Sequence, residues 1–221
     1  MVAYYGELIN KNINDIKNTE FLYPYLNINN PRELKKELYR LFGKQYGISK
    51  HTVSQAVESA RAALETYREA VRRKGREAIE YAEQNGNRLL ILAGRPYHID
   101  PEINHGINKL AKSLGFVVVS EDAVCELASP DHVRVLNQWT YHSRMYKAAQ
   151  YAVEHKNTEL VQLVSFGCGL DAITTDEVKA ILEENGKLYT QIKIDEITNL
   201  SALKIRLRSL LGAIERRERN G

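Results

Sequence analysis

The sequence predicts an α/β fold, namely a Rossmann-like or flavodoxin-like parallel sheet of about four strands with helices on both faces, preceded by a helical N-terminal extension. Before residue 87 the pattern is helical and rich in Ala, Glu and Arg, whereas after it short apolar runs alternate strictly with amphipathic segments. Such alternation is typical of parallel strands joined by right-handed crossovers. We therefore divide the chain into a helical extension, residues 1–87, and an α/β domain, residues 88–221.

The extension opens with an irregular segment and a short helix. Residues 1–29 mix Asn, Tyr and Ile without a period, so we expect them to be irregular and to place their tyrosines against a partner surface. The stretch Pro31–Phe42 predicts a helix that opens at Asn30, a good N-cap residue.

A long helix follows, from about residue 50 to about residue 85. Ser49 provides its N-cap, Asn85-Gly86 provides a C-terminal stop, and Gly75 is a weak point inside it. Its apolar residues recur at intervals of four and three, as in a helix packed along its length against another helix: Val53, Val57, Ala60, Leu64, Tyr67 and Val71.

The α/β domain contains four predicted strands, at Leu89–Ala93, Phe116–Ser120, Leu160–Ser165 and Leu188–Ile194. Helices are expected between and after them, at Pro101–Leu114, Asp131–His155, Thr175–Asn185 and Ser201–Arg217. If the strand order is 2-1-3-4, the ligand crevice lies between the first and third strands, outside their carboxyl ends. The loops Gly94–Asp100 and Phe166–Asp171 then face each other across one site.

The loop after the first strand carries the first group of candidate residues. Gly94 permits a sharp exit from the strand, Arg95 offers a planar donor fork for carboxylate or phosphate, and Tyr97 and His98 add a phenol and an imidazole. Because loop residues at strand ends often carry function, Arg95, Tyr97 and His98 are candidates for catalysis and Gly94 for cofactor binding. Asp100 is interpreted as the N-cap of the next helix.

The stretch LVQLVSFGCGLD, residues 160–171, places a cysteine between two glycines where a buried strand ends. Gly167 and Gly169 allow the backbone to approach a bound group closely, and a following helix N-terminus favours an anionic ligand or a thiolate at Cys168. The alternative is a structural turn with a small buried cysteine, because one cysteine makes neither a metal site nor a catalytic dyad.

A third cluster of aromatic and basic residues follows Trp139. His142 and Arg144 are candidates for catalysis and Tyr141 for cofactor binding, since all three could point over the crevice and help to bind an acyl or phosphate group. Equally, these side chains can form the thick helix face that covers the sheet, with Arg144 stacked on an aromatic ring. Helical periodicity does not show which side faces a ligand.

Composition excludes several classes of protein. With 221 residues and 43% hydrophobic content the chain can bury a core, and it contains neither an apolar run that could span a bilayer nor the features of a signal peptide. The net charge of +3 is mild and the charges are interleaved, so we expect no nucleic-acid partner and no membrane partner. Two cysteines, Cys125 and Cys168, make no disulfide framework, and the cytoplasm is the expected location.

Three motifs carry a resemblance to a known superfamily. LAGRPYHIDPEINHGI at 92–107, QWTYHSRMYKAAQY at 138–151 and SFGCGLDAITTDEV at 165–178 resemble the 2-hydroxyacyl-CoA dehydratase and benzoyl-CoA reductase superfamily, and more closely the dehydratase-like segment of its large activator-fused relatives, the CoA-substrate-specific enzyme activases. The resemblance implies an oxygen-sensitive protein of anaerobic metabolism with a 4Fe-4S or double-cubane iron-sulfur cluster. It also implies an ATP-dependent activator as electron donor, an acyl-CoA-like substrate, and Cys168 as a cluster ligand.

The chain departs from that pattern in two respects. No phosphate-binding loop of an ATPase is present, so nucleotide hydrolysis is expected in another segment or chain. A cluster needs about three or four thiolates, and Cys125 does not match a ligand position, so the isolated chain is expected to hold no cluster. Relatives carry further cysteines upstream, which makes Met1 an expected late start within a longer polypeptide. Cysteines of a partner segment then complete the site, or the cluster has been lost.

Three functions remain open from the sequence. The first is a domain of an iron-sulfur, ATP-coupled dehydratase or reductase that is active only with other segments or a partner subunit. The second is a non-catalytic interaction domain whose N-terminal helices dock onto the rest of a larger polypeptide. The third is a CoA or phosphate binder without a cluster, using Arg95 and a helix start at Thr174 and Thr175 as an anion site.

Overall fold

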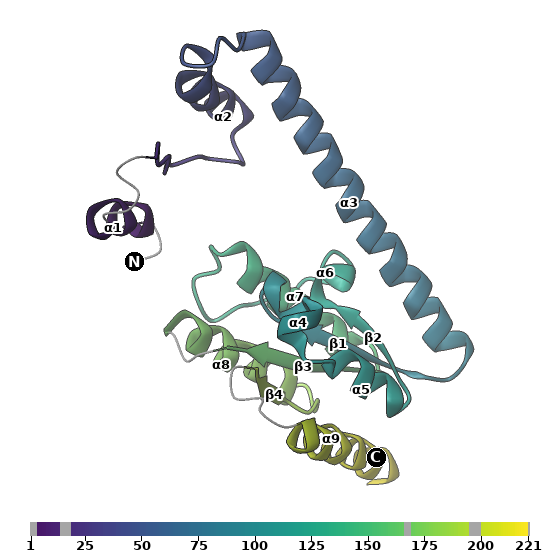
Figure 1. The fold of residues 1–221 in the computed structure, drawn as a ribbon. Coiled ribbons are helices and arrows are strands. Elements are labelled where there is room, and N and C mark those ends of the chain that lie inside the picture. Colours follow the sequence, from purple (N-terminus) through teal and green to yellow (C-terminus); the bar gives the residue numbers. More distant parts are fainter. Residues whose placement is uncertain (1–3, 14–18, 166–168, 195–199, 221) are drawn as a thin grey trace. The chain divides into compact units, whose positions relative to one another are not determined.

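The computed structural model describes residues 4–13, 19–165, 169–194 and 200–220 (Figure 1). The chain forms two compact units, Met1–Tyr67 and Arg68–Gly221, and the boundary falls inside the long helix α3, Lys50–Gln84. The division near residue 87 that composition suggested stays a prediction.

The first unit contains α1, Tyr5–Asn12, and α2, Pro31–Leu38, which continues as a π-helical turn, Tyr39–Gly43. The presence of α1 corrects the expectation that residues 1–29 are irregular throughout. An ion pair of 2.8 Å between Lys11 and Glu7, one turn apart, supports this helix locally. The predicted cap of α2 is confirmed, because Asn30 Oδ1 accepts a hydrogen bond from the Glu33 amide at 3.2 Å.

Helix α3 begins and ends where the sequence predicts. Ser49 Oγ accepts from the Thr52 amide at 3.0 Å, and Gly86 follows the last turn with φ +65°. Gly75 does not interrupt the helix. The apolar seam is buried only in part, which corrects the expectation of continuous helix packing: Val53 and Val57 are buried, whereas Leu64 and Tyr67 are exposed.

The second unit contains a four-stranded parallel sheet made of β1, Arg88–Ala93, β2, Phe116–Ser120, β3, Thr158–Val164, and β4, Thr190–Lys193. The strand order is β2-β1-β3-β4, so the predicted α/β fold and its 2-1-3-4 order are confirmed. The order reverses between β1 and β3, and parallel α/β sheets commonly bind ligands outside the carboxyl ends of the strands at such a point.

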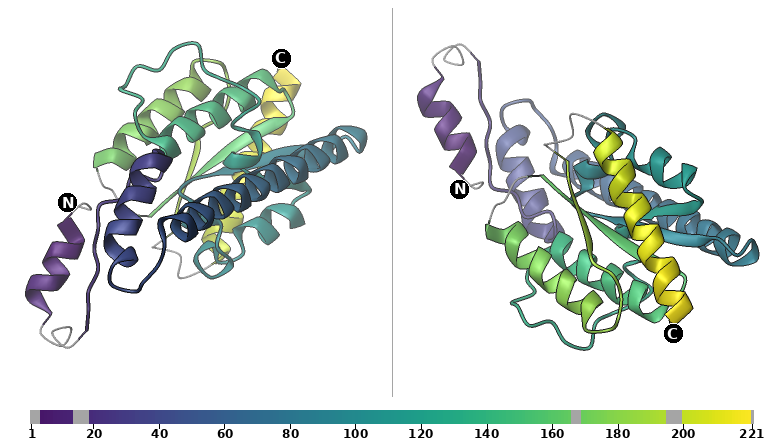
Figure 2. Two further views of the ribbon diagram at one scale, coloured as in Figure 1. Left: turned by 90° about the horizontal axis from the view of Figure 1, so that it is seen from above. Right: turned by 90° about the horizontal axis from the view of Figure 1, so that it is seen from below.

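Helices cover both faces of the sheet. Alternate side chains of β1 enter different cores, Leu89 and Ile91 on one face and Leu90 and Leu92 on the other. The first core is closed by the end of α3 and by α6, Glu121–Val124, α7, Thr140–Glu154, and α8, Gly169–Glu183. The second is closed by α5, Ile107–Ser113, and α9, Leu200–Asn220. Viewed from below, α9 lies across the sheet, and the view from above shows α7 and α8 (Figure 2).

Three helix predictions need correction. The expected helix Pro101–Leu114 is divided into α4, Pro101–Asn104, and α5, because His105 and Gly106 take positive φ angles of 51° and 78°. The expected helix Asp131–His155 begins only at Thr140. Before it, the Arg134 amide donates to the Glu177 carboxylate at 2.9 Å, so a side chain of α8 replaces a helical acceptor.

The third correction concerns α8, which begins at Gly169 instead of Thr175. Thr174 and Thr175 therefore lie inside a helix, and Thr174 is fully buried. Their amides are not at a free helix start, so the anion site proposed there is wrong.

A buried ionic cluster lies at the amino end of β3 and includes residues of α9 and of the connection between α8 and β4. Lys187 Nζ donates to the carbonyls of His155, Lys156 and Thr158 at 2.8, 3.0 and 2.8 Å. Arg217 of α9 pairs with Glu159, which is 1% exposed. Burial lowers the pKa of Lys187 and raises the pKa of Glu159, so both depend on these contacts to stay charged.

In the part of the chain that the structure describes, no helix is both long enough and apolar enough to cross a membrane.

Candidate functional site

The loop that follows β1 is built around a buried histidine. His98 lies in a single 3-10 turn, Pro96–Ile99, and is 1% exposed. Its Nδ1 accepts a hydrogen bond from the Arg95 amide at 3.0 Å, so the neutral ring carries its proton on Nε2. Nε2 lies 2.8 Å from Ser165 Oγ, the residue that follows β3, and donates to it. This hydrogen-bonded chain ties the ends of β1 and β3 together.

Gly94 makes room for that histidine. A Cβ at this position would lie 2.4 Å from His98 Nδ1 and 3.1 Å from the Leu163 carbonyl oxygen. Glycine is therefore required here by close approach of the imidazole ring. The predicted role of Gly94 in cofactor binding stays a prediction.

Arg95 contacts the first turn of α8. Its Nη2 and Nε lie 2.6 and 3.2 Å from Asp171 Oδ1. This pair is partly buried, with side-chain exposures of 31% for Arg95 and 11% for Asp171. The sequence suggested that the Arg95 guanidinium binds a ligand. Its positive charge is already partly neutralised by the Asp171 carboxylate.

The predicted glycine-cysteine turn lies between two residues that the β1 loop contacts. Gly167 and Cys168 fall outside the described residues, and Gly169 is the first residue of α8. On either side of them in the sequence, Ser165 contacts His98 and Asp171 contacts Arg95. The two loops thus meet at the flanks of the cysteine segment.

Tyr97 is the exposed member of the loop. Its side chain is 41% exposed, its ring packs edge-on against His98 with centroids 4.4 Å apart, and its hydroxyl lies 3.2 Å from Ser165 Oγ. The phenol of Tyr97 is thus held in place and remains open to solvent.

The aromatic and basic residues of α7 lie at two different places, one beside the Arg95–Asp171 pair and one at the end of β2. His142 is 8% exposed, and burial followed by the nearby charge of Arg95 lowers its pKa, so His142 stays neutral beside the Arg95–Asp171 pair. Arg144 lies 5.6 Å from the centroid of the Tyr141 ring and turns toward the end of β2. There it contacts Asp122 Oδ2 at 3.1 Å.

Glu121 and Asp122 directly follow β2, and sequence reasoning missed both. Glu121 is 3% exposed, accepts from the Gly94 amide and lies 2.9 Å from Arg144 Nη2. Burial raises its pKa to about 7, against the opposing charge of Arg144. Two carboxylates immediately after an apolar strand were the available signal, since strand ends gather functional groups in parallel sheets.

The site therefore brings together most of the predicted residues. Around Ser165 and Asp171 lie Arg95, Tyr97, His98 and His142. At the neighbouring strand end Arg144 contacts Glu121 and lies over the Tyr141 ring. Catalytic roles for the predicted residues stay predictions, because these contacts show only how the side chains are held.

Metal binding is not supported by the described residues alone. Among them, no group of three or more His, Cys, Asp or Glu side chains is arranged to hold a metal ion. Cys125, at the end of α6, is 3% exposed, and burial raises the pKa of its thiol, which opposes the thiolate form that metals bind. Its sulfur makes weak contacts of 3.9 Å to the Asp122 carbonyl oxygen and 4.0 Å to Glu126 Oε1.

The fold and the site define a parallel α/β domain whose polar residues gather at the topological switch point between β1 and β3. The profile of the family described as the CoA enzyme activase uncharacterised domain (DUF2229) matches residues 1–124. Because the match covers more than half of the 221 residues, the chain belongs to this family. Comparison with curated proteins and comparison with solved structures gave no significant match.

Proposed function

We propose that the chain is a domain of an iron-sulfur protein of the 2-hydroxyacyl-CoA dehydratase and benzoyl-CoA reductase type, which receives electrons from an ATP-dependent activator. Membership in a family named for CoA enzyme activases supports this proposal at the level of the system in which the domain works. The motifs at 92–107, 138–151 and 165–178 support the dehydratase-like assignment by resemblance.

The observation that carries the proposal is the meeting of the two loops at the carboxyl ends of β1 and β3. His98 contacts Ser165 at 2.8 Å and Arg95 contacts Asp171 at 2.6 Å. Ser165 and Asp171 each stand three positions from Cys168 in the sequence, the residue that the resemblance marks as a ligand. The chain is thus held on both sides of the motif cysteine, which supports this proposal.

The described residues do not by themselves fit an iron-sulfur cluster. A protein-held cluster takes three or four thiolates. Among the described residues the cysteine is Cys125, and it is buried in the core. On this proposal Cys168 supplies one ligand and cysteines from outside this chain supply the others, so the isolated chain holds none. When bound, such a cluster supplies low-potential electrons for an acyl-CoA-like small molecule.

The chain's own residues have roles that do not depend on the cluster. His98 positions Ser165 through a fixed Nε2 proton, and Arg95 positions Asp171. Tyr97 presents a phenol to the crevice. Glu121, whose pKa is near 7, can hold or release a proton at the neighbouring strand end at neutral pH.

One observation favours the alternative of a non-catalytic interaction domain. Both arginines of the site are paired within the chain, Arg95 with Asp171 and Arg144 with Glu121 and Asp122. Arginines used in this way stabilise the loops and have less capacity to bind an added phosphate or carboxylate. The same pairing weakens the second alternative, a CoA or phosphate binder without a cluster.

Iron and sulfide analysis tests the proposal. The chain is produced anaerobically together with the rest of its polypeptide or its partner subunit, as the natural protein, and as the variants Cys168→Ala and Cys125→Ala. Loss of iron and sulfide is expected for Cys168→Ala, whereas Cys125→Ala, which removes a buried thiol of raised pKa, keeps the natural iron content. Equal iron content in both variants and unchanged activity would favour the interaction domain.

A further inference from the structure

A groove runs along the outer edge of β2, on the side of that strand that does not pair with β1. It encloses about 610 Å³. Neighbouring residues of a strand point to opposite faces of a sheet, so a hollow that touches all of them lies against the edge of the strand. Every residue of β2, Phe116–Ser120, lines this groove.

The backbone of β2 is the first reason to expect a partner at this edge. β2 pairs with β1 on one side and is the outermost strand of the sheet that the structure describes. Half of the amide and carbonyl groups of an edge strand point away from its neighbour, and natural proteins commonly protect them with lysine, proline or a bulge in the strand. The sequence of β2, FVVVS, contains no charge and no proline. Its β-branched residues favour further strand pairing.

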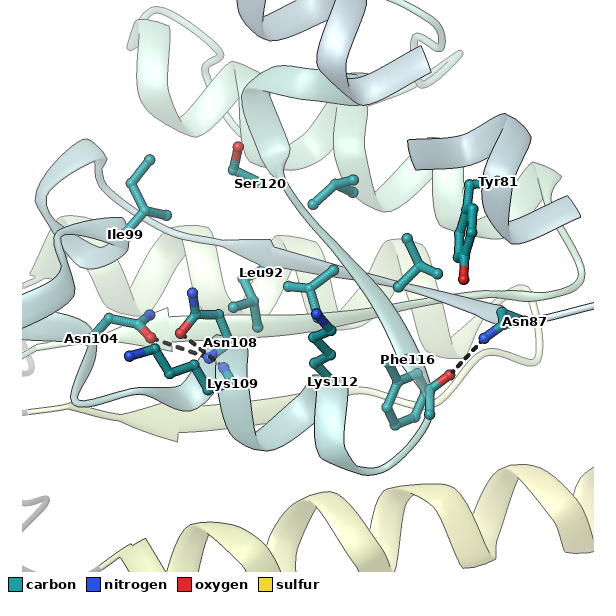
Figure 3. A pocket seen from close by; sticks show the side chains of 14 residues that line it. Tyr81, Asn87, Leu92, Ile99, Asn104, Asn108, Lys109, Lys112, Phe116 and Ser120 are labelled. Carbon is teal, nitrogen blue, oxygen red and sulfur yellow. Dashed lines mark hydrogen bonds between the residues drawn. The ribbon is translucent and has the colours of Figure 1, made fainter. Parts of the chain in front are cut away.

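The charge of the groove is the second reason. Lys109 and Lys112 of α5 line one wall together with Asn104 and Asn108 (Figure 3). Both lysines are exposed, and neither forms an ion pair with a described residue. The other wall carries an aromatic side chain instead of charged ones. This is Tyr81, near the end of α3, and its side chain is 57% exposed.

We propose that this groove binds an extended acidic segment of a partner protein, which adds to β2 as a further strand. Main-chain hydrogen bonds to β2 supply affinity, and the two walls supply specificity. Side chains of the added strand that face α5 meet Lys109 and Lys112 and are acidic. Those that face α3 meet Tyr81 and are apolar or aromatic. The recognised segment is thus about five residues long, roughly 16 Å, and alternates acidic with apolar residues.

A second copy of this chain is a poorer occupant. Pairing of β2 with its own copy about a two-fold axis would place the same surfaces against each other. Lys109 and Lys112 would then approach the same lysines of the second α5, and like charges at short range oppose such an interface. An acidic segment removes this repulsion.

Peptide binding to the full chain tests the proposal. The probe is a fluorescent peptide of about ten residues that alternates glutamate with valine, and its control is a peptide of the same composition with the glutamates and valines in separate blocks. The alternating peptide is expected to bind at least tenfold more tightly than the block peptide. Hydrogen exchange of the amides in 116–120 is expected to slow only with the alternating peptide, because strand addition occupies backbone groups.

Charge reversal provides the matched variants. Replacing Lys109 and Lys112 with glutamate is expected to weaken binding of the alternating peptide by about tenfold or more. The control replaces Lys204 and Arg208 of α9 with glutamate, an equal change of charge on exposed residues outside the groove, and leaves binding unchanged. Far-ultraviolet circular dichroism checks that both variants fold.

Three results would overturn the proposal. One is equal binding of the alternating and block peptides, and another is insensitivity of binding to the charge reversal at 109 and 112. The third is displacement of the alternating peptide by citrate at submillimolar concentration with no protection of the β2 amides, which would mark the groove as a site for small anions.

Discussion

Replacing Gly94 with alanine should disrupt the hydrogen-bonded chain that joins β1 to β3. The added methyl group would lie 2.4 Å from His98 Nδ1, a distance that real contacts do not show, so the imidazole must move. Movement of the ring breaks its bonds with the Arg95 amide at 3.0 Å and with Ser165 Oγ at 2.8 Å. Each buried polar group left without its partner costs about 1–3 kcal/mol, so we expect a loss of about 2–5 kcal/mol in the free energy of unfolding.

A double-mutant cycle measures this effect. Urea denaturation is followed by circular dichroism for the natural chain, Gly94→Ala, His98→Ala and the double variant. In the His98→Ala background the imidazole atoms beside Gly94 are removed, and the closest approach is then the 3.1 Å to the Leu163 carbonyl oxygen, so alanine at 94 should cost at least 1 kcal/mol less there.

A second glycine provides the control. Gly212 lies inside α9, and a Cβ there would meet nothing within 4 Å, so Gly212→Ala should stabilise the chain by about 0.5–1 kcal/mol. The reasoning is refuted if Gly94→Ala costs the same with and without the His98 ring, or if it behaves like Gly212→Ala.

Three further substitutions test other contacts of the second unit. Gly75→Ala should destabilise it by about 1–3 kcal/mol in thermal unfolding despite better helix propensity, because the new Cβ would lie 2.7 Å from Ala123 Cβ and 2.9 Å from its carbonyl oxygen. Lys187→Met should cost about 3–5 kcal/mol in urea, because three carbonyl oxygens lose their donor and Glu159 loses a compensating charge. Glu121→Gln should flatten the dependence of unfolding free energy on pH between about 4.5 and 7.

The sign of the Glu121 effect follows from its raised pKa. The folded chain binds this proton up to about pH 7, whereas the unfolded chain releases it near 4.5. Stability therefore falls as the pH rises through that window, by up to about 3 kcal/mol. A natural chain whose unfolding free energy stays level over this range, or a Glu121→Gln variant that keeps the slope, would contradict the assignment.

The Lys187 prediction has its own control. Lys179→Met removes an exposed lysine of α8 that pairs with Glu183 at 3.9 Å, and it should change stability by less than about 0.5 kcal/mol. A loss of similar size in both variants would mean that the cluster at the amino end of β3 contributes little.

The sheet was predictable because its signals are local. Each strand is a short apolar run bounded by polar residues, and strict alternation with helices fixes parallel strands. The breaks within helices were less accessible. The division at His105 depends on a positive φ in a non-glycine residue, and the late start of α7 depends on Glu177, which lies 43 residues from Arg134 in the sequence.

The candidate site shows the same limit. Residue types at strand ends were enough to select Arg95 and His98 and to expect that the two loops meet, whereas His142 was selected from the aromatic and basic cluster of a predicted helix. Sequence alone did not show that Arg95 is paired with Asp171, that His98 is buried, or that Glu121 is linked to Gly94, because each depends on long-range packing. Charge balance within a site is the part of its chemistry that sequence patterns describe least well.

At Gly75 and Ala123, two helices of the second unit pack so closely that no space remains for a side chain between them. Gly75 belongs to α3, the helix that both units share, and Ala123 belongs to α6, whose first residue is Glu121. Because Gly75 has no side chain, a displacement of α3 along this stretch moves its backbone directly against the backbone of α6. The environment that sets the proton affinity of Glu121 is thus mechanically connected to a helix that begins in the other unit.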